Sequence, residues 1–291
     1  MLSAEPKPRL DVTDMFVISL STVPPRFDKI GPTLDCLLRQ TAKPDKIIVY
    51  IPKSYPRFPD YDGSLPQVPE GVEVHVCERD FGPATKVLPA VQEFKGQDVD
   101  ILFCDDDALY PPNWAARFLK ERAKRPNAAI ASDGTEARDD APATMERAHQ
   151  PRALRLWRKT DPVYQTRRLL RWIKGRLTGK PQPVATRRSH LRSGYVDVVL
   201  GYGGVLVRPE FFDDDAFEIP HELRSVDDVW LSGMIGKNGV PIWLDAGHPF
   251  IPAGDADTAQ PLHAAVHAGL NRGQANKACI EYMRATYGIW P

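Results

Sequence analysis

The chain has few cysteines, no long apolar stretch and no net charge, and each absence narrows what it can be. Its four cysteines form no C-x-x-C pair, which predicts reduced thiols in a cytosolic protein rather than a disulfide framework. No apolar run approaches the roughly 18 to 20 residues that span a bilayer, and we expect no secretory signal at the N-terminus. The chain as a whole is not basic and carries no recognised nucleic-acid-binding module, so no nucleic-acid partner is expected.

The composition is that of a globular protein with a sizeable core. The 291 residues are 42% hydrophobic with a mean hydropathy of −0.37, enough for one large α/β domain or two small ones. Charge is distributed unevenly along this neutral chain. Residues 147–192 hold fourteen Lys or Arg and one acid, Asp161, a net charge of +13, so the rest of the chain carries a net charge of −13. This asymmetry calls for a local explanation.

Apolar runs and helical patterns alternate through the first hundred residues. Helices are expected at residues 32–40 and 84–94, and strands at residues 15–20, 46–51, 72–76 and 101–104. This alternation predicts βαβ units and a mainly parallel sheet, whose ligands bind beyond the carboxyl ends of the strands. Residues 53–70, rich in Pro, Tyr and Asp, are expected to form a long surface loop, which either is functional or only connects its two neighbouring elements.

The fourth expected strand ends in three carboxylates, Asp105, Asp106 and Asp107. Three like charges repel one another unless a positive charge lies among them. Side chains alternate along a strand, so Asp105 and Asp107 would point to one side and Asp106 to the other. Two carboxylates on one side suit a hard divalent cation, which prefers oxygen ligands. A solvated acidic loop is the alternative.

The sequence RDFGPATK at residues 79–86 follows the third strand and opens a helix. Gly82 allows a tight turn, and a helix N-terminus binds phosphate through free N–H groups. Lys86 would add a charge for a phosphate or pair with a carboxylate. The spacing is not that of a P-loop, and an ordinary strand-to-helix turn stays open.

A glycine-rich turn lies between two apolar runs further along the chain. Gly201, Gly203 and Gly204 permit positive φ angles and a close approach of the backbone to a ligand. A bulged hairpin would also explain them.

The next motif is an acidic pair, Asp227 and Asp228, at the start of a segment with helical apolar spacing. One carboxylate there would act as a general base on an attacking hydroxyl. The structural alternative is a capping box in which Ser225 pairs with Asp228.

Together these motifs resemble the GT-A glycosyltransferases, especially the inverting family 2 group, over about residues 15–244. The resemblance implies an α/β fold of the GT-A (Rossmann-like) type, with a mainly parallel mixed sheet flanked by helices, and a single domain over residues 1–291. The segments that carry it are FVISL (16–20), CDDDALYPP (104–112), GYGG (201–204) and VDDVWL (226–231). The implied parts are a nucleotide-sugar-binding half (about 12–135), a basic helical insertion (136–195), an acceptor and catalytic half (196–250) and a C-terminal helical segment (251–291).

The resemblance also implies roles for these residues. Asp107 would ligate Mn²⁺ or Mg²⁺, Asp105 would face the ribose or the metal, and Asp228, paired with Asp227, would be the base. A late His or a water would complete the metal shell; His263 is the first candidate, with His248 and His267 as the others. The implied nucleotide contacts are Asp80, Lys86, Asp105, Asp106, Gly203 and Gly204. RDFGPATK departs from the family's Asn-x-Gly turn because Asp80 replaces the Asn, and the absence of Q-x-x-R-W argues against a processive synthase.

The basic segment contains RRLLRWIKGRL at residues 167–177, a basic amphipathic helix. It is a candidate for an anionic membrane surface or an anionic ligand. An insertion that packs its leucine face on the domain, and a lid over the donor, are the alternatives. Its apolar face is expected to hold Leu169, Leu170, Ile173 and Leu177.

The sequence therefore predicts a metal-dependent inverting glycosyltransferase. It would move a sugar from a nucleotide-sugar donor to a glycan or lipid-linked sugar acceptor, in bacterial-type polysaccharide or glycolipid assembly. We expect it in the cytoplasm, peripheral at the inner face of the membrane. Two alternatives remain: a sugar-nucleotide nucleotidyltransferase, although the usual Gly- and Arg-rich loop after the first strand is missing, and a non-enzymatic basic membrane-surface protein.

Overall fold

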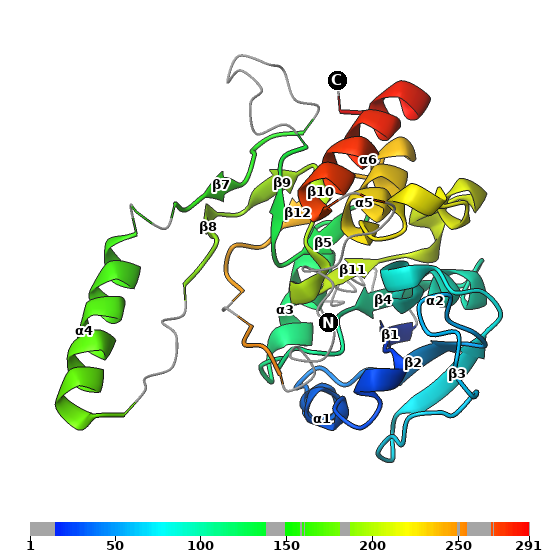
Figure 1. Cartoon of the computed structure of the whole chain (residues 1–291). Coiled ribbons are helices and arrows are strands. Elements are labelled where there is room, and N and C mark those ends of the chain that lie inside the picture. The colour runs from blue at the N-terminus through cyan, green and yellow to red at the C-terminus, as the bar shows by residue number, and fades with distance from the viewer. Residues whose placement is uncertain are drawn as a thin grey trace, which may run out of the picture.

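The molecule is built around an eight-stranded sheet with helices on both faces (Figure 1). The computed structural model describes residues 15–137, 149–157, 159, 161–180, 187–248, 251–254, 269 and 271–290. The strands, in spatial order, are β3 (Glu73–Cys77), β2 (Lys46–Pro52), β1 (Met15–Ser21), β4 (Val99–Phe103), β11 (Val205–Val207), β5 (Ala129–Ala131), β12 (Ile242–Leu244) and β9 (Gly194–Val196).

The sheet is mixed but mainly parallel, which confirms the predicted α/β class. Only β11 and β9 run against the other six strands. Two small sheets lie beside it within the described residues. They pair β10 (Val198–Val199) with β6 (Gly134–Thr135), and β7 (Leu154–Arg155) with β8 (His190–Arg192).

The central strands are apolar on both faces because helices cover both. In β1, Val17 packs in one core and Ile18 in the other, and both are fully buried. Such doubly covered strands read as continuous apolar runs, as FVISL does. One core includes residues of α2 (Leu88–Glu93), α5 (Asp227–Lys237) and α6 (Arg272–Tyr287), and the other those of α1 (Gly31–Leu38) and α3 (Trp114–Arg122).

The single helix expected over residues 84–94 is wrong. The chain instead forms a 3₁₀ turn over Gly82–Lys86 and then α2, which begins at Leu88. Pro89 lies in the first turn of α2, where its missing N–H has no intrahelical partner to lose. Because the two helical segments are separate, Lys86 is not part of α2, and its side chain lines a pocket at the ends of the strands.

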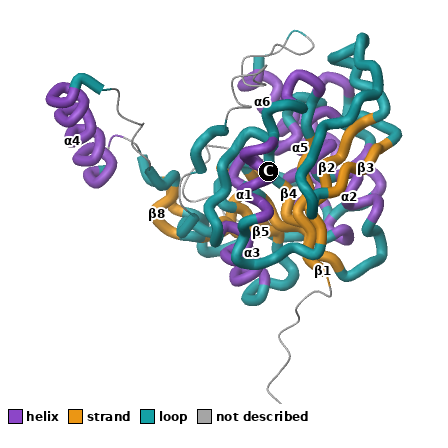
Figure 2. Tube along the Cα trace, turned by 90° about the horizontal axis from the view of Figure 1, so that it is seen from below, coloured by secondary structure: helices purple, strands orange, loops and turns teal. Residues whose placement is uncertain are grey.

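Helix α4 (Pro162–Thr178) stands apart from the rest of the molecule (Figures 1 and 2). It contains the expected segment 167–177 and extends it by five residues at the N-terminal side. Asp161 caps it by accepting a hydrogen bond from the Tyr164 N–H at 2.9 Å, and Gly179 ends it in the left-handed region. The alternative in which its leucine face packs on the domain is wrong. The apolar side chains at 169, 170, 173 and 177 are 39–82% exposed.

All four cysteines are free, as predicted. Helix α6 confirms the C-terminal helix and begins at Arg272, behind a capping box of Asn271 and Gln274. In the described part of the chain, no helix combines the length and the apolar character that crossing a bilayer requires. His263 and His267 lie outside the described residues.

Candidate active site

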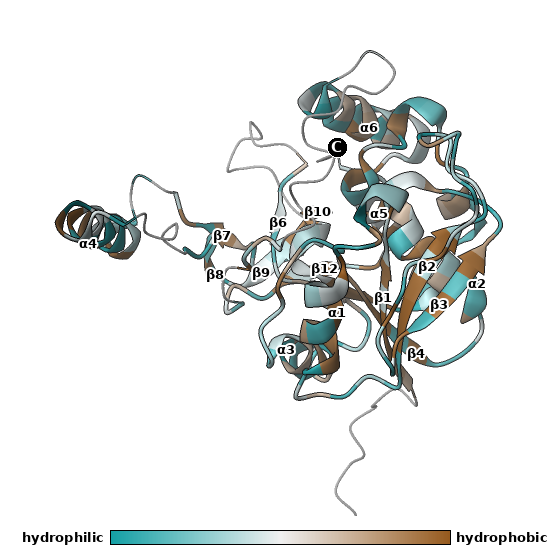
Figure 3. Ribbon diagram, turned by 60° about the horizontal axis from the view of Figure 1, so that its bottom comes forward, coloured by the Kyte–Doolittle hydropathy of each residue, from teal (hydrophilic) through white to brown (hydrophobic). Residues whose placement is uncertain are grey.

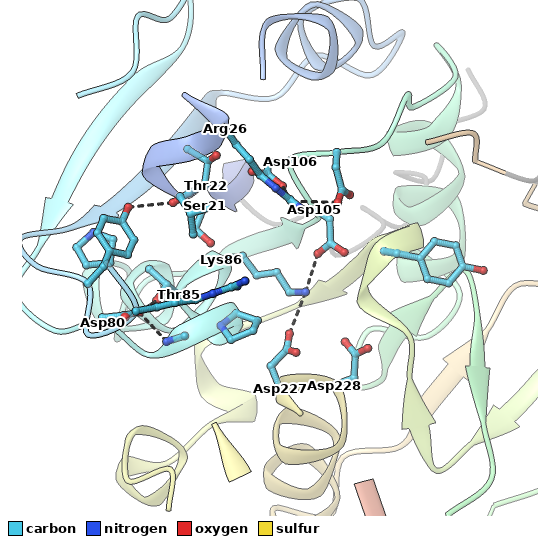
Figure 4. A pocket seen from close by; sticks show the side chains of 18 of the residues that line it. Ser21, Thr22, Arg26, Asp80, Thr85, Lys86, Asp105, Asp106, Asp227 and Asp228 are labelled. Carbon is cyan, nitrogen blue, oxygen red and sulfur yellow. Dashed lines mark hydrogen bonds and ion pairs between the residues drawn. The ribbon is translucent and has the colours of Figure 1, made fainter. Parts of the chain in front are cut away.

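A pocket of about 450 Å³ opens where β1, β2 and β4 end, and we call it the main pocket (Figure 4). Its lining includes Ser21 from the end of β1, Pro52 from the end of β2, and Asp105, Asp106 and Asp107 directly after β4. Parallel strands present their carboxyl ends at one edge of a sheet, and this is where α/β proteins bind ligands. The pocket therefore lies where the sequence placed the site.

Lys86 joins the two acidic motifs in this pocket. Its Nζ lies 2.7 Å from Asp105 Oδ1 and 2.9 Å from Asp227 Oδ2 (Figure 4). Burial alone would lower the pKa of Lys86, but Asp105, Asp227 and Asp228 outweigh it and raise that pKa well above its usual value. A permanent buried cation thus offsets the repulsion among carboxylates that lie far apart in the sequence.

The three carboxylates after β4 do not alternate as predicted. The strand ends at Phe103, so its alternation does not extend to the three acids, and Asp106 and Asp107 lie in a turn. Arg26 Nη1 lies 2.6 Å from Asp106 Oδ1 and 3.0 Å from Asp107 Oδ2, while Asp105 faces Lys86. Burial raises the pKa of Asp106, and the charge of Arg26 opposes that rise.

Sequence reasoning missed Arg26, which comes from a 3₁₀ turn at Pro24–Arg26 after β1. In the sequence, this segment shows only that the Gly- and Arg-rich loop of a nucleotidyltransferase is missing. The sequence did contain a signal for Arg26. It is a lone cation that follows a buried strand and two prolines, and the three acids after β4 required a positive charge near them.

The acidic pair opens helix α5 without capping it. The N-cap residue is Val226, and no side chain caps the helix there. The predicted alternative of a capping box between Ser225 and Asp228 is therefore wrong. Asp227 and Asp228 are both buried at the positive end of the helix, so their carboxylates serve the pocket.

Asp228 has the environment of a general base. Its Oδ1 accepts a hydrogen bond from the Gly201 N–H at 2.9 Å, and Arg272 Nη2 lies 3.6 Å from its Oδ2. Burial and the neighbouring charge of Asp227 raise the pKa of Asp228 to about 7, although Lys86 opposes the rise. A carboxylate with a pKa near neutrality is well matched to proton abstraction. A Cβ at Gly201 would lie 2.8 Å from both Asp228 Oδ1 and Lys86 Nζ, so a larger residue would have to displace the ends of these two side chains.

Gly203 and Gly204 line no part of the main pocket. The Gly203 carbonyl accepts a hydrogen bond from Trp114 Nε1 at 2.8 Å, and a Cβ at Gly203 would lie 2.0 Å from Ser132 Oγ. Gly204 has a φ of +95°, and a Cβ there would lie 2.4 Å from the Trp114 ring. Close packing against Ser132 and Trp114 therefore explains why glycine occupies both positions. Their predicted contact with the nucleotide remains a prediction.

Asp80 holds the turn that carries Lys86. Its Oδ1 accepts hydrogen bonds from the Gly82 N–H at 2.7 Å and from Thr85 Oγ1 at 3.3 Å. Gly82 has a φ of +63°, the left-handed conformation expected of a glycine turn. Asp80 also lines the main pocket, and burial raises its pKa.

One wall of the main pocket is aromatic and comes from the long loop after β2. Tyr55, Arg57 and Phe58 line it, and the Tyr55 hydroxyl donates to the Thr22 carbonyl at 2.9 Å. The Tyr55 and Phe58 rings meet edge to face, with centroids 6.0 Å apart. This arrangement favours the functional interpretation of residues 53–70, because aromatic faces suit a planar ligand ring.

The donor chemistry of the main pocket fits a divalent cation. Six carboxylates and four cations line it, a formal charge of −2 (Asp80, Asp105, Asp106, Asp107, Asp227 and Asp228 against Arg26, Arg57, Lys86 and Arg272). Carboxylate oxygens are the ligands that Mg²⁺ and Mn²⁺ prefer. The described residues contain no cluster of three or more His, Cys, Asp or Glu arranged around a metal position. His248 is buried against the Phe118 ring and lines a different cavity.

A protein-family model matches part of the chain. The family model for glycosyl transferase family 2 matches residues 26–192, more than half of the chain. The matched range includes the Asp105–Asp107 triplet and ends before the Asp227–Asp228 pair. No curated protein matches the chain in sequence.

Two similar solved structures are of S. aureus TarS. Residues 1–349 of TarS in complex with UDP show 16% identity and a TM-score of 0.39, covering 81% of this chain and 59% of that one. A second TarS structure shows 15% identity and a TM-score of 0.40, covering 84% and 37%. The chain thus spans less than two thirds of either TarS chain.

Proposed function

The chain belongs to glycosyl transferase family 2, and from that membership we propose that it transfers a sugar from a nucleotide-sugar donor to a hydroxyl of a glycan or lipid-linked acceptor. The observation that carries the proposal is the meeting of two acidic motifs at Lys86, in one pocket. We place the reaction in bacterial-type polysaccharide or glycolipid assembly.

The donor is proposed to fill the half of the pocket between the aromatic wall and the acidic triplet. Its nucleobase would lie against Tyr55 and Phe58, and its diphosphate near Asp105 and Asp107. These two carboxylates would hold Mn²⁺ or Mg²⁺, which when bound neutralises charge on the departing diphosphate. The formal charge of −2 in the lining supports this assignment, because a divalent cation would cancel it.

Asp228 is proposed as the base. Its carboxylate takes the proton of the acceptor hydroxyl, whose oxygen bonds to the anomeric carbon while the bond from that carbon to the diphosphate breaks. Attack opposite the leaving group inverts the anomeric configuration. The Gly201 N–H orients the carboxylate of Asp228, and burial together with the charge of Asp227, which Lys86 holds in place, raises the pKa of Asp228 to about 7. Asp227 therefore supports the base without touching the substrate.

Family membership also favours this reaction over the nucleotidyltransferase alternative. That class would place a Gly- and Arg-rich loop after the first strand. Here the position holds Pro24, Pro25 and Arg26, and Arg26 is paired with Asp106 and Asp107.

A donor screen with Mn²⁺ tests the proposal. We expect one nucleotide sugar to raise the melting temperature and to be hydrolysed or transferred, with activity lost on chelation. Asp107→Ala should abolish the metal-dependent activity, whereas the control Asp214→Ala, which changes an exposed carboxylate paired with Lys95, should keep it. Activity that is indifferent to both chelator and Asp107→Ala would refute the metal-dependent mechanism.

We further propose that helix α4 attaches the enzyme to an anionic membrane surface. From Pro162 to Thr178 the helix holds five basic residues and no acid. Apolar and polar residues occur together along it, as Figure 3 shows, and its leucine face is exposed. Each basic residue near anionic lipid contributes about 1 kcal/mol, and the apolar face adds burial in the interface. Anionic lipid lines the cytoplasmic leaflet, which supports a peripheral location at the inner face.

Co-sedimentation with vesicles tests the attachment. We expect binding to phosphatidylglycerol-containing vesicles, weakened by salt, and little binding to neutral phosphatidylcholine vesicles. Replacing Arg168, Arg171 and Lys174 by Gln should abolish it. A control triple that changes Lys43, Lys95 and Lys277 on the body should bind as wild type does. Equal binding by the two triple variants would count against α4 as the attachment.

A further inference from the structure

A second cavity adjoins the main pocket and has no part in the function proposed so far. It measures about 220 Å³ and is lined by Ser132 and Asp133, which follow β5, and by Tyr202 and Gly203 of the glycine turn. Tyr202 lines both cavities. A molecule held in the second cavity would therefore lie next to the wall of the main pocket that carries Asp228.

Asp133 organises this cavity. Its Oδ2 accepts hydrogen bonds from Tyr202 Oη at 2.5 Å and from Ser189 Oγ at 2.8 Å, and its Oδ1 accepts one from the Gly134 N–H at 2.8 Å. Burial would raise the pKa of Asp133, but hydrogen bonds from His190, Tyr202 and Ser189 outweigh it and lower that pKa. Asp133 is thus a fixed anion whose hydrogen bonds hold Tyr202 in place between the two cavities.

Other buried polar groups of the lining have no such partners. Ser132 Oγ and both ring nitrogens of His248 lack a hydrogen-bond partner among the described residues, and these side chains belong to residues only 9% and 6% exposed. Burial lowers the pKa of His248 to about 4, so its ring is neutral at pH 7 and offers one donor and one acceptor. Buried polar groups in folded proteins are normally satisfied, so these point to a hydroxylated ligand.

The charge of the second cavity is opposite to that of the main pocket. Arg187, Arg188 and the single carboxylate of Asp133 line it, so its formal charge is +1 with His248 neutral, against −2 in the main pocket. The Arg187 guanidinium is held by donating from Nη2 to the Leu156 carbonyl at 2.7 Å. An anionic group on a bound molecule would be repelled from the main pocket and attracted here.

We infer that the second cavity holds the acceptor, and that the acceptor is a hydroxylated ring bearing a carboxylate or phosphate group. Its anionic group pairs with Arg187 and Arg188, and its ring hydroxyls bond to Ser132 and His248. The reacting hydroxyl then extends past Tyr202 toward Asp228. This inference rests on the proposed function, because only a glycosyl transfer gives the acceptor hydroxyl its role.

Equilibrium binding without donor tests the inference independently of catalysis. Calorimetric or NMR titrations compare glucose with glucuronate and glucose 6-phosphate. We expect at least one of the two anionic sugars to bind at least about tenfold more tightly than glucose, since each hydrogen bond to a charged group contributes that much. The better-bound anion identifies the group, carboxylate or phosphate. The double variant Arg187→Gln/Arg188→Gln should lose the preference, while the control Arg155→Gln/Arg192→Gln on the small β7–β8 sheet should retain it.

Two outcomes would overturn the inference: equal affinities for the three sugars in the wild type, or an unchanged preference in the Arg187/Arg188 variant. Donor hydrolysis by the wild type, measured in parallel without acceptor, separates this failure from failure of the proposed function. Hydrolysis with equal sugar affinities refutes the acceptor inference alone. Anion-selective binding without any donor turnover refutes the glycosyl transfer and leaves the cavity's anion selectivity in place.

Discussion

The main pocket and helix α4 place charge in opposite ways. In the pocket, Lys86 is shared by Asp105, which follows β4, and Asp227, which opens α5; Lys86 and Asp227 are buried, and Asp105 is partly exposed. On α4, five cations stand without an acid on the same helix, beside exposed apolar side chains. The first arrangement exists only in the folded molecule, and the second is complete in seventeen consecutive residues. The proposed chemistry therefore depends on the fold, whereas the proposed membrane attachment depends on a local sequence.

The largest expected effect tests the pocket side of this comparison. Asp228→Asn removes the proposed base but keeps the side-chain volume, so transfer should fall by about 10³-fold, within the range for general bases. Donor binding should survive, because the donor is assigned to the other half of the pocket. Steady-state rates and thermal shift with donor measure the two effects, with Asp215→Asn as an exposed control. Loss of donor binding instead would assign Asp228 a structural role.

The next effect compares the two regions directly through one substitution. Lys86→Met leaves the buried carboxylate of Asp227 and the partly buried carboxylate of Asp105 without their cation, so the unfolding free energy should fall by about 3 to 5 kcal/mol. Lys174→Met on α4 should change it by less than about 0.5 kcal/mol, because surface substitutions rarely do more. Urea titrations of both variants decide the matter. Similar losses would mean that α4 is not the independent region described above.

A pH profile tests the raised pKa of Asp228. The base must be ionised, so activity should fall as pH drops below about 7, the pKa of Asp228. Asp227→Asn removes a charge that raises this pKa, and the acidic limb should move to lower pH. The same raised pKa contributes a loss of stability as pH rises from about 4 to about 7, since the folded state binds the proton more tightly than the unfolded chain. If the acidic limb of the pH profile lies at the same pH in Asp227→Asn as in the wild type, the charge of Asp227 does not raise the pKa of Asp228.

The smallest effect is expected on the apolar face of α4. Leu170→Gln replaces an exposed side chain by another good helix former, so the unfolding free energy should change by less than about 0.5 kcal/mol. Leu34→Ala in α1, at a fully buried position, should cost about 2 to 5 kcal/mol. A large loss in Leu170→Gln would show that this face packs against the protein.

Most elements could be predicted because each signal is local. The apolar run of β1 and the helical segment at residues 167–177 follow from short stretches of sequence, and the structure has both within a few residues. The break between the 3₁₀ turn and α2, within residues 84–94, could not be predicted. The turn that ends at Lys86 is held by Asp80 and by the ion pairs of Lys86 with Asp105 and Asp227. Local helix propensity carries no information about partners that lie far away in the sequence.

The same division applies to the site. The sequence alone determined that three acids follow a buried strand, that two more open a helix, and that a basic amphipathic helix interrupts the chain, because composition and periodicity are local properties. Only the tertiary structure decided which charges meet. Arg26 takes Asp106 and Asp107, Lys86 takes Asp105 and Asp227, and Tyr202 comes to stand between two cavities of opposite charge. Ion pairing and burial depend on distances in space, which the sheet order sets.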